Sequence, residues 1–266
     1  MNNFFKKMPS SKRINDAIQK NGFLIVENVI DKELIISLKS SLENAIEKEA
    51  NWHKHKSYKD YGMVMVCAMY DKIFIDLLAH PSLMFPFHTM MGEGCIVYAY
   101  TSSSMPPKES NYSSRIHVDC PRLIPGYITN MACTIALDDF TENNGATFFL
   151  PSSQNVIKLP NQKNFYKNAS RFLAPAGSVL FFNARLIHAG GINNSENWRH
   201  AITLNICRPW MKQRIDLPRL LMNNNLNIKK INPKALQKLG FQAQIPSSLE
   251  EYYAPIKYRK FTQLPE

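Results

Sequence analysis

The chain has 266 residues, of which 45% are hydrophobic and 20% charged, and its 32 Lys and Arg against 21 Asp and Glu give a formal net charge of +11. This is the composition of an ordinary soluble globular protein. No apolar run reaches the roughly 20 residues that span a bilayer, and the N-terminus lacks the apolar core of a signal peptide, which predicts a cytoplasmic protein without a membrane span.

The positive charge favours anionic partners, and its distribution is uneven. From Pro209 onward there are ten Lys and Arg against four Asp and Glu. Because no zinc knuckle, helix-turn-helix or basic-aromatic repeat accompanies this surplus, nucleic-acid binding is not favoured. We expect a flexible leader (1–11), one domain (12–210) and a basic C-terminal extension (211–266) packed on that domain.

The five cysteines are odd in number and scattered, which predicts reduced core residues rather than disulfides or a zinc site. They are Cys67, Cys95, Cys120, Cys133 and Cys207. Cys120 is the exception, because it directly follows Asp119, a candidate metal ligand.

The first half of the chain predicts helices around one strand. A short helix over Ile14–Lys20 ends at Gly22 and leads into a buried strand, Phe23–Val26. Asp31 then caps a helix whose apolar residues recur at three- and four-residue steps. Residues 51–60, with His53 and His55, read as a solvated loop. Further on we expect helices over 73–78 and 82–91, with His80 and His88 as packing or surface residues, and a strand over 95–101.

The second half predicts strands. A polar loop (102–114) precedes the run Arg115-Ile116-His117-Val118-Asp119. We expect a strand over 127–137, a polar turn over 138–145 and a partner strand over 146–150. After a polar excursion (162–170), a strand over 177–182 leads to His188, and a last one covers 199–207. Beyond it, Asn232 is expected to cap one helix and Ser247 or Ser248 another.

His117 and Asp119 are the candidate start of a metal site. In an extended run, residues i and i+2 project from the same face, so their imidazole and carboxylate converge. His188, at the end of another strand-like run, supplies a third ligand. Two His and one carboxylate with open positions opposite is the arrangement of non-haem Fe(II) oxygenases. Arg199 follows eleven residues later, and its guanidinium suits a two-point grip on a carboxylate.

Between the two histidines lies a cassette, Leu137-Asp138-Asp139-Phe140-Thr141-Glu142-Asn143-Asn144-Gly145-Ala146, which continues to Leu150-Pro151-Ser152-Ser153. With the flanking His, Asp and Arg it resembles the phytanoyl-CoA dioxygenase family of Fe(II)/2-oxoglutarate oxygenases, over roughly residues 14–210. The resemblance implies that His117, Asp119 and His188 bind iron, that Arg199 anchors 2-oxoglutarate, and that Thr134 lies where the family often touches this co-substrate. O2 is then the remaining co-substrate.

Two departures from the family pattern are visible. Gly190 stands where the family often has a Ser or Thr that shares the co-substrate carboxylate with the Arg, and the cassette ends Ser153-Gln154 where Ser-His is usual. The first concerns 2-oxoglutarate binding and the second a turn.

Many short strands without βαβ alternation predict a mainly β protein with flanking helices. A double-stranded β-helix, the jelly roll of cupin-like proteins, suits the chemistry, and the resemblance implies the same fold. The expected function is hydroxylation of a small-molecule substrate by a monomer or homodimer. The alternatives are an inactive jelly roll that binds a ligand, although all four key residues are present, and a zinc hydrolase, which leaves Arg199 and the cassette unexplained. Lys108, Arg115 and Arg122 flank the metal segment and favour a substrate with an anionic group.

Overall fold

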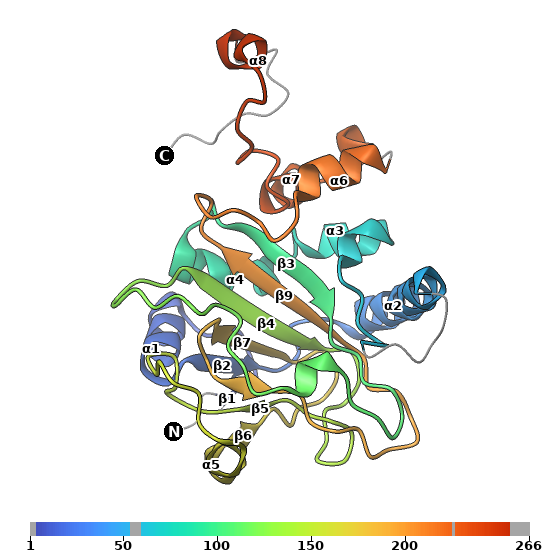
Figure 1. The fold of residues 1–266 in the computed structure, drawn as a ribbon, viewed down its shortest axis with the longest axis vertical. Coiled ribbons are helices and arrows are strands. Elements are labelled where there is room, and N and C mark those ends of the chain that lie inside the picture. The colour runs from blue at the N-terminus through green and yellow to red at the C-terminus, as the bar shows by residue number, and fades with distance from the viewer. Residues whose placement is uncertain (1–3, 54–59, 225–226, 256–266) are drawn as a thin grey trace.

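A computed structural model describes residues 4–53, 60–224 and 227–255. Its strands form a six-stranded sheet in the order β1-β2-β7-β4-β9-β3 and a three-stranded sheet in the order β6-β5-β8 (Figure 1). The strands are β1 (Phe4–Phe5), β2 (Phe23–Val26), β3 (Ile96–Ser102), β4 (Asn130–Ala136), β5 (Phe148–Phe149), β6 (Ser170–Arg171), β7 (Val179–Asn183), β8 (His188–Ala189) and β9 (Ala201–Cys207). No helix in the described ranges is long and apolar enough to cross a membrane.

Helices cover one face of the larger sheet (Figure 1). These helices are α1 (Ser11–Asn21), α2 (Lys32–Trp52), α3 (Lys72–Leu77) and α4 (Pro81–Met91). The helices that come later in the chain are α5 (Gln162–Asn168), α6 (Leu217–Asn223), α7 (Pro233–Lys238) and α8 (Leu249–Tyr253). The start of α2 is fixed by Asp31, whose carboxylate accepts from the Leu34 amide at 2.8 Å. His80 has the same role at α4, accepting from Leu83 at 3.2 Å, which confirms its structural reading.

The alternation of side chains along the strands divides the core in two. On one face of the larger sheet, Cys133, Phe181 and Leu204 pack with the helices. On the other, Ala132, Ala136, Leu180, Phe182 and Ala201 pack with residues of the smaller sheet and its loops, such as Phe149 and Phe172. The second face is the interior of the double-stranded β-helix. The two sheets face each other without closing into a barrel.

Several predicted elements differ from the structure. The strand expected over 127–137 is confined to β4, and the segment 146–150 does not pair with it. β4 lies between β7 and β9, whereas β5 pairs with β6 and β8 in the smaller sheet. The prediction of a hairpin was wrong because a jelly roll sends consecutive strands to opposite sheets. The polar excursion contains α5, capped by Asn161, and α6 was not predicted.

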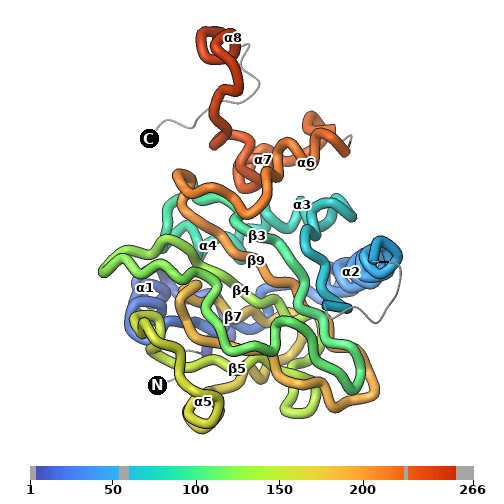
Figure 2. The backbone as a smooth tube through the Cα atoms, in the orientation of Figure 1, coloured from blue at the N-terminus to red at the C-terminus, as the bar shows by residue number. Residues whose placement is uncertain are grey.

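Described residues near both ends of the chain contact the larger sheet or its flanks. Residues Phe4 and Phe5, within the predicted leader, pair in parallel with Ile25 and Val26 of β2. Towards the C-terminus, the side chain of Lys238 in α7 donates to the Glu93 and Cys95 carbonyls next to β3. α8 lies far from both sheets, beyond α6 and α7 (Figure 2). The five cysteines are all buried and free, as predicted.

Candidate active site

His117 and Asp119 stand on a short extended segment that crosses from one sheet to the other. The expected strand is reduced to a single bridge, in which His117 and His188 exchange both backbone hydrogen bonds at 3.0 Å. Ile116 and Val118, on the opposite side of the segment, pack against the small cluster around Phe165. The alternation of apolar and polar residues therefore points His117 and Asp119 the same way.

Asp119 is placed by the turn that precedes β8. Its backbone N–H donates to the Ala184 carbonyl at 2.8 Å, and the next residue, Cys120, donates to the same oxygen at 3.0 Å. Arg185, next in the turn, donates to the Cys120 and Pro121 carbonyls. These bonds bring together two segments of the chain that lie about 65 residues apart in the sequence.

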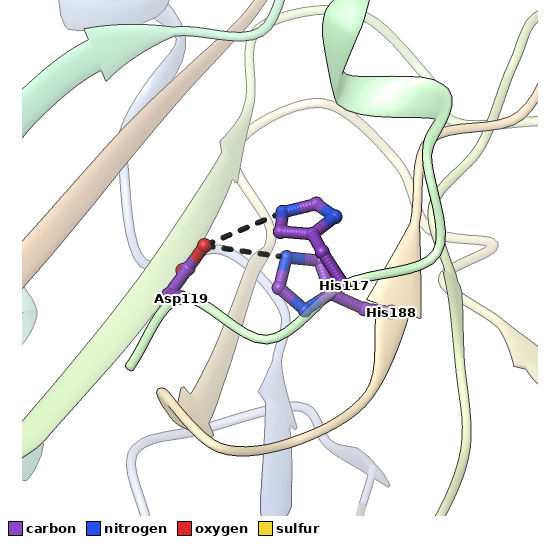
Figure 3. Close-up of side chains that lie close together, drawn as sticks. All are labelled: His117, Asp119 and His188. Carbon is purple, nitrogen blue, oxygen red and sulfur yellow. Dashed lines mark ion pairs between the residues drawn. The ribbon is translucent and has the colours of Figure 1, made fainter. Parts of the chain in front are cut away.

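The three predicted ligands converge on one point (Figure 3). Asp119 Oδ1 lies 3.4 Å from His117 Nε2 and 3.7 Å from His188 Nε2, and the candidate ligand atoms all lie within 4.8 Å of one another. The other ring nitrogens are engaged with backbone carbonyls: His117 Nδ1 with Arg115 at 2.7 Å and His188 Nδ1 with Leu186 at 2.9 Å. A proton on Nδ1 leaves each Nε2 lone pair facing the shared centre.

The three groups shift one another's protonation. Burial lowers the pKa of His188 to about 4, which keeps the ring neutral at physiological pH. For Asp119, burial opposes ionisation, but the neighbouring histidines outweigh it and lower the carboxyl pKa. For His117, burial is likewise outweighed by the hydrogen bond and charge of Asp119, which raise the pKa of the ring. Two imidazoles and a carboxylate within bonding reach of one point fit a divalent cation.

Arg199 is fully buried, at 1% exposure, two residues before β9. Its guanidinium donates to the carbonyls of Ser103, Gly145 and Asn144, at 2.8, 3.1 and 3.4 Å. It also stacks on the Phe140 ring at 4.4 Å. Burial lowers the pKa of Arg199 to about 9. Among the described residues, no carboxylate forms an ion pair with this buried cation.

The other sequence candidates lie in different surroundings. Thr134 is buried in β4 and pairs with Thr203 across the β4/β9 ladder. Arg208, at the far end of β9, donates to Ile128, Met91 and Met90 carbonyls. Cys120 is buried next to Thr129, with 3.5 Å between Sγ and Oγ1.

Gly190, the departure from the family pattern, is closely packed against the loop before the metal segment. A Cβ at this position would lie 2.6 Å from Met105 Cε and 2.9 Å from Ser113 Oγ. The loop before the metal segment thus fills the place that a serine side chain would take.

Asn205 was missed by the sequence analysis. It is buried, its Oδ1 accepts from Asn130 Nδ2 at 3.0 Å, and its side chain contributes to the lowered pKa of the Asp119 carboxyl. The only available signal is a polar residue between Leu204 and Ile206 in an apolar strand, and this does not reveal which residue it contacts.

Comparisons with known proteins identify the family of this chain. A sequence model of the phytanoyl-CoA dioxygenase (PhyH) family matches residues 18–201. Protein Rv1501 of Mycobacterium tuberculosis is 27% identical over 254 residues, which cover 92% of each chain. The dioxygenase trt7 of Aspergillus terreus is 20% identical, with 74% of this chain and 73% of that protein aligned.

Solved structures show the same fold. The non-haem α-ketoglutarate-dependent carbocyclase SnoK of nogalamycin biosynthesis superposes with a TM-score of 0.60 at 18% identity, covering 76% of this chain and 85% of that one. The epimerase SnoN, solved with Fe3+ and α-ketoglutarate, gives 0.58 at 16% identity, with coverages of 75% and 84%.

The family match extends from α1 to the start of β9 and so includes all three converging side chains and the buried arginine. The family is one of non-haem iron enzymes that consume 2-oxoglutarate and O2. The chain belongs to the phytanoyl-CoA dioxygenase family and is a 2-oxoglutarate-dependent dioxygenase.

Proposed function

We propose that this protein hydroxylates an unactivated C–H bond of a small-molecule substrate, with His117, Asp119 and His188 as the ligands of one Fe(II). The observation that carries the proposal is the convergence of two imidazole nitrogens and a carboxylate oxygen within 4.8 Å. Bound iron, with 2-oxoglutarate and O2, supplies the oxidising power that inserts one oxygen atom into the C–H bond and yields succinate and CO2.

Arg199 is proposed to anchor the distal carboxylate of 2-oxoglutarate. It is a buried cation two residues before β9, without an ion-pair partner among the described residues, and a buried charge is stable only when it is paired or well hydrogen-bonded. Three of its five N–H donors are directed at backbone carbonyls, which leaves two for a carboxylate.

The inner face between Arg199 and the triad is lined by small side chains. Ala201 and Thr203 follow Arg199 at alternate positions of β9, opposite Ala136 and Thr134 of β4. These facing positions carry small side chains, and Thr134 is proposed to line the co-substrate site. The chain's own part is to hold the ligands, orient the co-substrate and exclude water.

The substrate is proposed to carry an anionic group, such as a phosphate, a carboxylate or a CoA or carrier-protein thioester. Arg115 and Arg122 are exposed on either side of the metal segment, and among the described residues neither forms an ion pair. Arg115 instead lies over the Tyr112 ring, with its guanidinium carbon at 3.4 Å. Lys108 contributes less than its charge suggests, because Glu196 pairs with it at 2.7 Å.

The test is succinate formation across a panel of matched anionic and neutral small molecules, at low and high salt, with the oxidised product identified by mass spectrometry. The proposal expects stimulation by anionic compounds, weakened by salt, and a product heavier by one oxygen atom. If only neutral compounds stimulate succinate formation, and salt has no effect, the substrate carries no anionic group. A desaturated or cyclised product would show that the reaction is not a hydroxylation.

A further inference from the structure

We propose that three neighbouring loops form a surface that docks on an anionic lipid membrane. This surface, which we call the rim, consists of residues 121–129, 154–161 and 208–215. The first loop leads into β4 and the third follows β9, so both stand at the same end of the larger sheet. The first loop also begins two residues after Asp119, which places the rim next to the metal segment. The inference concerns lipid binding and does not depend on the proposed function.

Printed contacts join the three loops, although they are far apart in the sequence. The guanidinium of Arg185 donates to the Pro121 carbonyl of the first loop at 2.6 Å and to the Val156 carbonyl of the second at 2.7 Å. Tyr127 of the first loop stacks on Trp210 of the third, with 6.4 Å between the ring centroids, and its hydroxyl accepts from Trp210 Nε1 at 3.2 Å. In Figure 2 the loops lie along one side of the molecule, green before β4, yellow beside α1 and orange after β9.

Each loop presents a large apolar side chain to solvent. Ile124 is 42% exposed, Ile157 is 85% exposed and Trp210 is 64% exposed. A single exposed apolar side chain is common in globular proteins, but a group of them on adjacent loops marks an interaction site. Tryptophan is also suited to the boundary between lipid and water, because its ring is apolar and its N–H is polar.

The charge of the rim selects an anionic partner. Arg122, Lys158 and Lys212 stand beside the apolar side chains, and all three are exposed and form no ion pair among the described residues. None of the three loops contains an Asp or a Glu. Basic side chains attract anionic headgroups while neighbouring apolar side chains enter the lipid boundary. Apolar side chains carried on separate loops suit a deformable lipid layer better than the preformed surface of an acidic protein.

The experiment is sedimentation of the full-length protein with phosphatidylcholine vesicles, prepared with and without phosphatidylglycerol, at low and high salt. Ile157→Asn removes the most exposed apolar side chain of the rim. Ile36→Asn is its matched control, because Ile36 of α2 is also an exposed isoleucine, at 60%. The tryptophan fluorescence of the wild type and of Trp210→Phe gives a second measurement. Thermal unfolding shows that each variant is folded, and no metal or 2-oxoglutarate is added.

A pair of double variants tests the charges. Lys158→Gln with Lys212→Gln removes two positive charges from the rim. Lys229→Gln with Lys230→Gln removes two exposed positive charges outside the rim, so the net charge of the two proteins is the same. A difference between them therefore reports on the position of the charges and not on their number.

We expect the wild type to bind the vesicles that contain phosphatidylglycerol, more weakly at high salt, with fluorescence shifted to shorter wavelength. Ile157→Asn should bind about ten-fold more weakly, because an apolar side chain no longer leaves water. The double variant of the rim should also bind more weakly, Trp210→Phe should lose the fluorescence shift, and both controls should match the wild type.

If the wild type binds neither kind of vesicle, the proposal is wrong. Equal binding by Ile157→Asn and the wild type would also overturn it, since it would show general attraction by charge alone. A wild type that ignores vesicles but binds an acidic protein through Ile157 would assign the rim to a protein partner instead of a membrane.

Discussion

Arg199 combines a structural and a proposed binding role in one side chain. Its contacts with Ser103, Gly145 and the Phe140 ring tie the loop before the metal segment to the cassette. A lysine placed there would keep the positive charge but not the planar fork that reaches several acceptors at once. Arg199→Lys and Arg199→Ala can therefore be compared to separate the binding role from the structural role.

Arg199→Lys should raise the KM for 2-oxoglutarate ten-fold or more, because breaking a buried, bidentate charge pair typically costs about 2 to 5 kcal/mol. Its affinity for the metal should stay that of the wild type. Steady-state kinetics with varied 2-oxoglutarate measures the effect, and Arg208→Lys at the other end of β9 is the control. Arg199→Ala should show the same rise in KM and also lose stability, since it leaves buried carbonyl oxygens unpaired. An unchanged KM in both Arg199 variants would show that another residue binds the distal carboxylate of 2-oxoglutarate.

At the scale of elements, the turn after β8 and the loop before the metal segment are fitted to each other at Gly190. The Gly190 N–H donates to the Ser113 carbonyl at 2.7 Å, and the space for a side chain is taken by Met105 and Ser113. Restoring the serine that relatives often carry is therefore not a gain of function here.

Gly190→Ser should lower the free energy of unfolding by about 1 to 3 kcal/mol, the usual cost of overpacking. Chemical denaturation of the metal-free protein measures it. The double variant Gly190→Ser with Ser113→Gly, which opens the occupied space, should recover part of the loss. Full stability in the single variant, with tighter 2-oxoglutarate binding, would show that the loop yields and that the missing hydroxyl is the more important feature.

The elements that local chemistry encodes were predictable from the sequence. The left-handed C-cap at Gly22 ends α1 and the Asp31 cap begins α2, both by short-range bonds, and the apolar steps of α2 define its buried face. The convergence of His117, Asp119 and His188 followed from strand alternation and from the resemblance. The partners of β5 did not follow, because strand pairing in a jelly roll is set by long-range packing. The hydrogen bond between Asn130 and Asn205 was missed for the same reason.

At the scale of the whole molecule, buried histidines make stability depend on pH. His200 is 3% exposed and stacks on Trp198, with 5.6 Å between the ring centroids. Its Nε2 lies 3.5 Å from Oε1 of Glu43 in α2. Burial lowers the pKa of His200 to about 4, despite the nearby charge of Asp138. Between this value and the ordinary 6.5, the unfolded chain binds more protons than the folded one, so stability falls as pH is lowered through that window.

The metal-free wild type should lose stability between pH 7.5 and pH 5, and His200→Gln should lose less. One and a half units below the unfolded pKa correspond to about 2 kcal/mol for this residue. The dependence should be reduced rather than abolished, because burial also lowers the pKa values of His88 and His188 to about 4. Denaturation at the two pH values gives the difference, and an identical pH dependence in wild type and variant would show that His200 does not remain neutral in the fold.

His117, Asp119 and His188 are proposed to hold the iron that drives 2-oxoglutarate turnover. The decisive measurement is the succinate formed when protein loaded anaerobically with one equivalent of Fe(II) is mixed with 2-oxoglutarate and O2, for the wild type and for His188→Ala. Removing one of three protein ligands from the metal should abolish turnover, so we expect succinate from the wild type and none from the variant above the level of free iron. Undiminished succinate from a folded His188→Ala protein would contradict it.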